Sequence, residues 1–164
     1  MPIETLGFDH IDLTVNDLSA SHPFYEKVLR EMGFRRAPDD GHSVIFHNGI
    51  TSLAIRAARE DVRGAAFNRY RVGLHHLAFR AARRRDVDDF YAFLNTQGLP
   101  VLDAPAEYPE YGSDYYAVFF ADPDGIKLEL AHFPWGYWCR VMTEGADPRA
   151  RYPRGQARDD TTQT

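Results

Sequence analysis

The 164-residue chain is predicted to fold as an α+β protein built from two tandem modules of the same design. Two observations predict this class. First, FDHIDLTV (8–15) recurs as LHHLAFRA (74–81), with His10 aligned on His76. Second, a segment that begins with Phe-Tyr follows each histidine at the same distance, at Phe24 and Phe90. A repeat that keeps strand-like and helix-like segments in register indicates two copies of one supersecondary unit.

In the first copy, apolar residues at every second position of 11–15 predict a strand with one buried face. The following segment, FYEKVLREMGF (24–34), has apolar residues at three-and-four spacing, which predicts a helix that ends at Gly33. SVIFH (43–47) and TSLAIR (51–56) flank an Asn-Gly pair and predict a hairpin.

The second copy repeats this order. A strand is predicted over 77–81, and a helix follows it, with Val87, Phe90, Tyr91 and Leu94 on its apolar side and Gly98 at its end. YYAVFF (115–120) and IKLELA (126–131) then flank a DPDG turn. Each module therefore consists of a strand, a helix and two or three further strands.

The predicted organisation is one combined globular domain. Residues 1–56 form the first module, 57–73 a polar linker, 74–138 the second module, and 139–164 a polar C-terminal tail. The tail is rich in Pro, Gly and Arg, a composition typical of loosely held segments.

Charge and composition exclude several classes of function. The net charge of −5 comes from well-mixed acidic and basic residues, which argues against a nucleic-acid or membrane surface. Cys139 is the only cysteine, so no internal disulfide can form and a reducing compartment fits best. The N-terminus does not read as a signal peptide, and no stretch approaches the roughly 18 apolar residues of a membrane span. We expect a soluble, cytoplasmic protein.

Strand alternation predicts which side chains share a face. If Ile11 and Leu13 pack on the helix, His10 points to the opposite face of its strand, and the same rule places His76 and Glu129 away from their helix. If the strands curve around a common cleft, the three side chains can meet there. Two histidines and one carboxylate form a known site for a divalent ion that leaves positions open for substrate. His75 has the opposite parity, and we interpret it as structural.

The ligand set suits Fe²⁺, Mn²⁺, Ni²⁺, Co²⁺ and Zn²⁺ equally, so the sequence does not name the metal. Parity also places Arg56 and Arg80 on the cleft side, where a guanidinium can bind a carboxylate or phosphate. Tyr115 and Phe119 are predicted to line the same cleft. The arginines favour an anionic substrate and the aromatic residues an aromatic one.

The duplicated module, and above all FFADPDGIKLEL (119–130), resembles the vicinal oxygen chelate superfamily, which includes glyoxalase I, extradiol dioxygenases, fosfomycin-resistance transferases and bleomycin-binding proteins. The resemblance covers residues 7–132. It implies two βαβββ modules, eight strands that curve around a metal-binding cleft, and ligands at His10, His76 and Glu129. Such a metal binds substrate through two neighbouring oxygens.

Two departures from the superfamily's patterns are informative. Glyoxalase I-like members carry a fourth ligand on the last strand of the first module, where this chain has Ala54. Extradiol dioxygenases carry a Tyr just ahead of the DPDG turn, where this chain has Phe119. The bleomycin-binding branch generally lacks the ligands, and this chain keeps three.

We therefore expect a metal-dependent lyase, isomerase or transferase that acts on a small oxygenated molecule by stabilising an enolate or oxyanion. Glu129 is expected to serve as ligand and also as a catalytic base. An Fe(II) extradiol-type dioxygenase and a metal-free small-molecule binding or resistance protein are the alternatives. The expected partners are the small-molecule substrate and a second copy of the chain in a homodimer, in which the cleft forms within one chain or between two.

Overall fold

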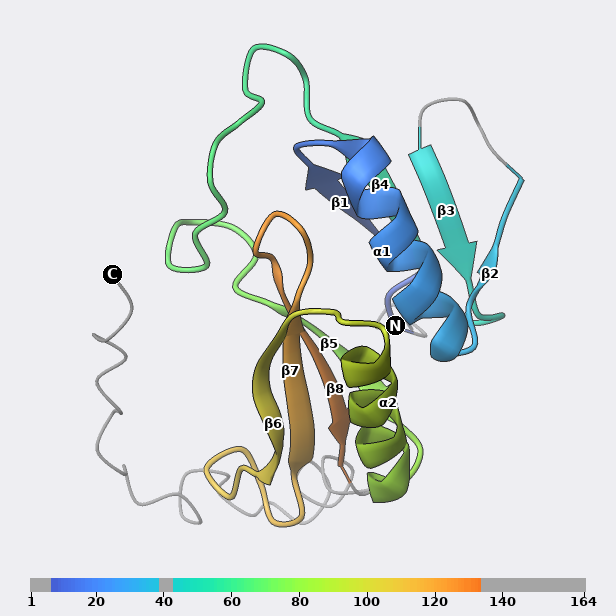
Figure 1. The fold of residues 1–164 in the computed structure, drawn as a ribbon, viewed down its shortest axis with the longest axis vertical. Helices are drawn as coiled ribbons and strands as arrows, with labels where there is room; N and C mark the ends of the chain where they lie inside the picture. The colour runs from blue at the N-terminus through green and yellow to red at the C-terminus, as the bar shows by residue number, and fades with distance from the viewer. Residues whose placement is uncertain (1–6, 39–42, 134–164) are drawn as a thin grey trace, which may run out of the picture.

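The computed structural model describes residues 7–38 and 43–133, and it consists of two βαβββ modules (Figure 1). The predicted α+β class is confirmed. In the first module the elements are β1 (His10–Val15), α1 (Leu18–Glu31), β2 (Arg35–Arg36), β3 (Ser43–His47) and β4 (Ser52–Ala57). Strand β1 pairs in parallel with β4, and the remaining pairs are antiparallel, so the sheet has the order β1-β4-β3-β2.

The second module repeats this topology. Its elements are β5 (Leu77–Ala81), α2 (Arg84–Thr96), β6 (Val101–Glu107), β7 (Tyr116–Ala121) and β8 (Lys127–His132). The sheet order is β5-β8-β7-β6, the same as in the first module, with β5 parallel to β8. The repeat read from the sequence is therefore a true structural duplication. The predicted tail, 139–164, with Cys139, lies outside the described residues.

The two helices end in the same way, as the glycines predict. Gly33 and Gly98 have φ angles of +85° and +62°, in the left-handed region that favours glycine. The amide of Phe34 donates to the carbonyl of Leu29, and the amide of Gly33 donates to that of Arg30. At the end of α2, the amide of Leu99 donates to the carbonyl of Leu94, and the amide of Gly98 donates to that of Asn95. This pair of backbone hydrogen bonds is the Schellman motif, and it satisfies carbonyls that a helix end leaves unpaired.

Strand β6 was not predicted from its sequence, and its composition explains why. VLDAPAE (101–107) contains Pro105 and lacks clean alternation of apolar and polar residues. The strand lies at the edge of its sheet, and its register against β7 shifts twice. Proline and bulges are tolerated at such an edge, because the outer side of the strand makes no ladder hydrogen bonds.

One core unites the two modules. The helix-facing sides of both sheets contribute to a single cluster of buried apolar residues, in which Phe24 of α1 contacts Phe120 of β7 with ring centroids 6.3 Å apart. Phe34 meets Phe79 edge to face at 6.0 Å. Since both helix-facing sides point into this core, the opposite sides of the two sheets point away from it.

A buried polar contact also joins the modules. The hydroxyl of Tyr25 in α1 donates to Oδ2 of Asp122, in the turn between β7 and β8, at 2.9 Å. The other carboxylate oxygen of Asp122 accepts the amides of Asp124 and Ile126. The DPDG turn is therefore anchored to the first module as well as to its own. Within the described residues, neither helix has the length and hydropathy of a membrane span.

Candidate metal centre

Strand β1 alternates as predicted. Leu13 and Val15 are buried, while His10, Asp12 and Thr14 are exposed on the side away from α1. His10 is the first residue of the strand, and its side chain is 61% exposed. Its Nδ1 lies 2.9 Å from Oδ2 of Asp9, and this hydrogen bond is the main reason that the pKa of His10 is raised.

His76 and Glu129 lie in contact on the second module. Glu129 is in the middle of β8 and only 2% of its side chain is exposed, although it carries an ionisable group. Its Oε2 lies 3.1 Å from Nε2 of His76, which directly precedes β5. Two atoms bound to one ion at about 2.1 Å and roughly at right angles lie about 3 Å apart, so this separation suits two ligands of one metal.

Burial opposes charge on both members of this pair. It raises the pKa of Glu129, against the opposing effects of the Tyr115 hydrogen bond and of Lys127. It also lowers the pKa of His76, and the cations Lys127 and Arg69 act in the same direction. Both shifts favour the uncharged forms, so this close contact does not depend on opposite charges. A neutral imidazole is also the form that binds metals.

Aromatic side chains surround Glu129. The hydroxyl of Tyr115 donates to its Oε1 at 2.5 Å, and burial raises the pKa of this tyrosine. Phe119 is the register partner of Glu129 on β7 and is buried. Nζ of Lys127 lies 3.8 Å from the centre of the Phe119 ring, and Tyr108 meets the same ring edge to face. Burial is also the main cause that raises the pKa of Tyr108 to about 12.

The two predicted arginines lie apart from this pair. Nε of Arg56 on β4 donates to Oδ2 of Asp12 at 2.8 Å, so its charge is already balanced on the face that carries His10. Arg80 on β5 is exposed and borders a cavity between the modules. Ala54, where glyoxalase I-like members carry a fourth ligand, is the register partner of Asp12 and is buried.

The single chain brings two of the three predicted ligands together. Within residues 7–38 and 43–133, no group of three His, Cys, Asp or Glu side chains is placed to hold a metal ion. His10 is on the sheet of the first module, and its charged neighbours are Asp9, Asp12 and Arg56. His10 lies apart from the pair because the shared core directs the ligand-bearing faces of the two sheets away from it.

Two neighbours of the pair were missed from the sequence. Nδ1 of His75 lies 2.7 Å from Nδ1 of His76, although strand parity assigned His75 to the opposite face. Parity fails there because β5 begins at Leu77, so the alternation does not extend back to either histidine. Tyr108 was also missed, since it follows the irregular strand β6. The adjacent pair His75-His76 is the one signal that could have indicated the first contact.

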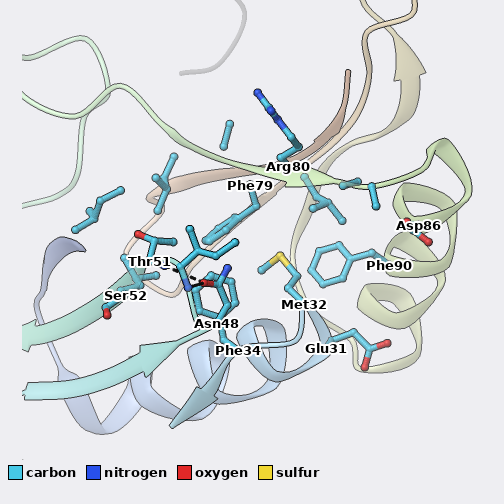
Figure 2. A pocket seen from close by; sticks show the side chains of 18 of the residues that line it. Glu31, Met32, Phe34, Asn48, Thr51, Ser52, Phe79, Arg80, Asp86 and Phe90 are labelled. Atoms are coloured by element: carbon cyan, nitrogen blue, oxygen red, sulfur yellow. Dashed lines mark hydrogen bonds between the residues drawn. The ribbon is translucent and has the colours of Figure 1, made fainter. Parts of the chain in front are cut away.

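A cavity of about 840 Å³ lies between the modules, beside β5. Figure 2 shows Met32 and Phe34 of the first module and Phe79 and Phe90 of the second around this space, with Arg80 directed away from them. His10, His76 and Glu129 do not line it. The cavity is therefore a neighbour of the candidate metal centre and not part of it.

The paired βαβββ modules define a fold of the vicinal oxygen chelate type, and comparison with known proteins agrees. The family model for the Glyoxalase/Bleomycin resistance protein/Dioxygenase superfamily matches residues 7–130. The chain belongs to this superfamily. It is 36% identical over 121 residues to the uncharacterized protein YqjT of Bacillus subtilis, which covers 74% of this chain and 94% of that protein.

Two further relatives carry names that state an activity. The metallothiol transferase FosB of Bacillus licheniformis is 30% identical over 125 residues, which covers 76% of this chain and 74% of that enzyme. The crystal structure of lactoylglutathione lyase from Agrobacterium tumefaciens superposes with a TM-score of 0.61 at 25% identity. That match covers 81% of this chain and 98% of the lyase. The predicted resemblance is thereby confirmed at the level of the superfamily.

Proposed function

We propose that this protein is a divalent-metal-dependent enzyme that acts on a small oxygenated molecule, with His10, His76 and Glu129 as metal ligands. The observation that carries the proposal is the contact between His76 and Glu129. A carboxyl group that is almost completely buried is costly unless a partner or a cation compensates it. Here its Oε2 lies 3.1 Å from an imidazole nitrogen, with a spacing that suits a shared ion.

The residues around the pair have defined tasks in this proposal. When bound, a divalent ion supplies Lewis-acid stabilisation of a developing enolate or oxyanion. Tyr115 holds one oxygen of Glu129, which fixes the orientation of the carboxylate. Glu129 accepts a proton when it acts as a base. Phe119 and Tyr115 form an aromatic wall for the substrate.

The third ligand is supplied, in this proposal, by a second copy of the chain. His10 is exposed and no described group completes the His76-Glu129 pair within one chain. Among the described residues, β1 and β5 each pair with a strand on one side only. Phe8 and Ile50, both 85% exposed, stand at the cavity beside these strands. Large exposed apolar side chains are typical of a surface that a partner covers.

The relatives support this assignment. One is named a metallothiol transferase and another a lactoylglutathione lyase. One name states a transferase and the other a lyase, which makes these two classes our first choices for this chain. Arg80, which borders the cavity beside β5, is the arginine that we assign to an anionic substrate.

Metal content and subunit mixing test the proposal together. Protein purified without chelator is expected to contain one divalent ion per chain by elemental analysis. His10→Ala and His76→Ala are each expected to lose it. In an equal mixture of the two variants, half of the dimers are mixed, and each mixed dimer has one intact site, so about a quarter of the wild-type metal should return. Absence of recovery would place the whole site within one chain.

One observation favours a second candidate, the metal-free binding protein, because no three-ligand group is complete in the described chain. Wild-type protein without stoichiometric metal, even after incubation with Mn²⁺, Fe²⁺ and Zn²⁺, would favour this candidate. Oxygen uptake with catechol-like compounds in the presence of Fe²⁺ would instead indicate the dioxygenase.

A further inference from the structure

We propose that His75 is a positioning residue that fixes the ring orientation and tautomer of His76. This inference rests on the proposed function, since it concerns how one metal ligand is held. His75 comes from the loop that precedes β5, and its role follows from contacts that the ring makes on both of its sides.

The two nitrogens of His76 have different partners. Nε2 faces Oε2 of Glu129 at 3.1 Å, and Nδ1 faces Nδ1 of His75 at 2.7 Å. The two imidazole rings are 5.0 Å apart between centroids and inclined by 77°. Both ring nitrogens of His76 thus have a close partner, so rotation of the ring would break the hydrogen bond to His75 and the contact with Glu129.

The contact between the two Nδ1 atoms requires that one ring donates and the other accepts. If His75 donates, Nε2 of His76 carries the remaining proton on the side of Glu129. If His76 donates, its Nε2 has a free lone pair, which is the form that a metal needs. In this proposal His75 accepts, so that the proton of His76 stays on Nδ1 and Nε2 keeps its lone pair for the metal.

His75 is itself held from the outer side. Its ring meets the ring of Tyr70 edge to face at 5.9 Å. The guanidinium of Arg69 donates to the Tyr70 hydroxyl at 2.7 Å and lies over the same ring. The segment between the modules therefore contributes an outer layer to the candidate metal centre. Such outer partners orient a ligating histidine and raise its affinity for metal.

Metal titration tests the role. We compare Mn²⁺ binding by calorimetry for the full-length wild type, His75→Leu, His75→Asn and His76→Ala. His75→Leu is expected to weaken binding by about 10- to 100-fold, the effect typical of a lost outer partner. The amide of Asn occupies the place of Nδ1 and can donate or accept, so His75→Asn should restore most of the affinity. His76→Ala should abolish binding.

Nitrogen NMR of the histidine side chains gives a second readout that needs no metal. In the metal-free wild type, His76 is expected in one dominant tautomer, whereas in His75→Leu it is expected as a mixture of two. Thermal unfolding of the variant should be unchanged, because His75 is exposed. Equal affinity and equal tautomer populations in wild type and His75→Leu, while His76→Ala loses the metal, would overturn this inference alone. Failure of the wild type to bind Mn²⁺ would overturn the proposed function and this inference with it.

Discussion

At the scale of single residues, the environment of Glu129 is the unusual feature of this protein. Its buried carboxyl group accepts a hydrogen bond from Tyr115 on one oxygen and lies in contact with His76 through the other. Burial raises its pKa, and the tyrosine acts in the opposite direction by stabilising the charged form. The stability of the second module should therefore depend on these partners.

Tyr115→Phe tests this dependence. The change removes one hydroxyl and leaves a buried oxygen of Glu129 without its donor, so we expect a loss of about 1–3 kcal/mol in the free energy of unfolding. Tyr116→Phe is the matched control. Its hydroxyl donates to Asp88, whose side chain is exposed and can bond water instead, so its loss should stay within about 0.5 kcal/mol. Equal losses in urea unfolding would show that the contact with Glu129 is unimportant for stability.

At the scale of elements, the helix ends carry much of the sequence information. Asp17 caps α1, since its side chain accepts from the amide and the hydroxyl of Ser19. These two hydrogen bonds lower the pKa of Asp17. A lowered pKa in the folded state means that the charged carboxylate stabilises the fold above the ordinary pKa of 3.8. That stabilisation is lost as the pH falls through the lowered value.

Asp17→Asn should therefore flatten the acid dependence of stability. Asparagine keeps a capping oxygen but carries no charge, so we expect stability close to that of wild type at pH 7. Below about pH 4, the wild type should lose stability faster than the variant. Thermal unfolding between pH 2 and 7 measures both. Parallel curves for the two proteins would contradict the assigned role of the Asp17 charge.

Gly33 provides a second test at this scale. A Cβ atom built at this position has no heavy atom within 4 Å, so a side chain meets no obstacle there. Only the backbone angle of +85° opposes substitution. Gly33→Ala should cost about 1–2 kcal/mol, the penalty of a left-handed conformation for a residue with a Cβ. Gly33→Asn should cost less, because asparagine tolerates this conformation. Unchanged stability in Gly33→Ala would mean that the Schellman turn is not required.

At the scale of the whole molecule, one core and one buried hydrogen bond hold the modules together. Tyr25 donates across the module boundary to Asp122, a buried carboxyl group whose pKa is raised by burial. Tyr25→Phe keeps the ring and its contact with Phe24 but removes the donor. We expect a loss of about 1.5–3 kcal/mol, as for hydrogen bonds to charged groups.

Hydrogen exchange separates this effect from a local one. If Tyr25 couples the modules, amide protection should fall in both β4 and β8 of the variant. A loss of protection restricted to α1 would show that the bond stabilises only its own helix. Tyr116→Phe again serves as control, because its hydroxyl bonds Asp88 within the second module.

The fold was largely predictable, and particular residues show why. The repeat of His10 at His76 predicted the two-module design, and the alternation in 11–15 predicted which side of β1 is buried. Gly33 and Gly98 predicted where the two helices end. These signals are local, since they depend on strand and helix periods and on backbone angles. Strand β6 was not predicted, because its position at a sheet edge allows Pro105 and an irregular register, and its sequence therefore lacks the alternation typical of a strand.

The sequence alone places His10 and Glu129 on strand faces opposite the helices, because side chains alternate between the two faces of a strand. It does not place His76, which precedes the first residue of β5. Which of these faces meet depends on how the two modules pack against each other. Packing of α1 against the second module, through Phe24 on Phe120 and Tyr25 on Asp122, turns the ligand-bearing faces away from the common core. Glu129 thus has His76 beside it and His10 on the other sheet. The contact between His75 and His76 also depends on the tertiary structure. Strand β5 begins after both histidines, so strand alternation does not predict which way their side chains point.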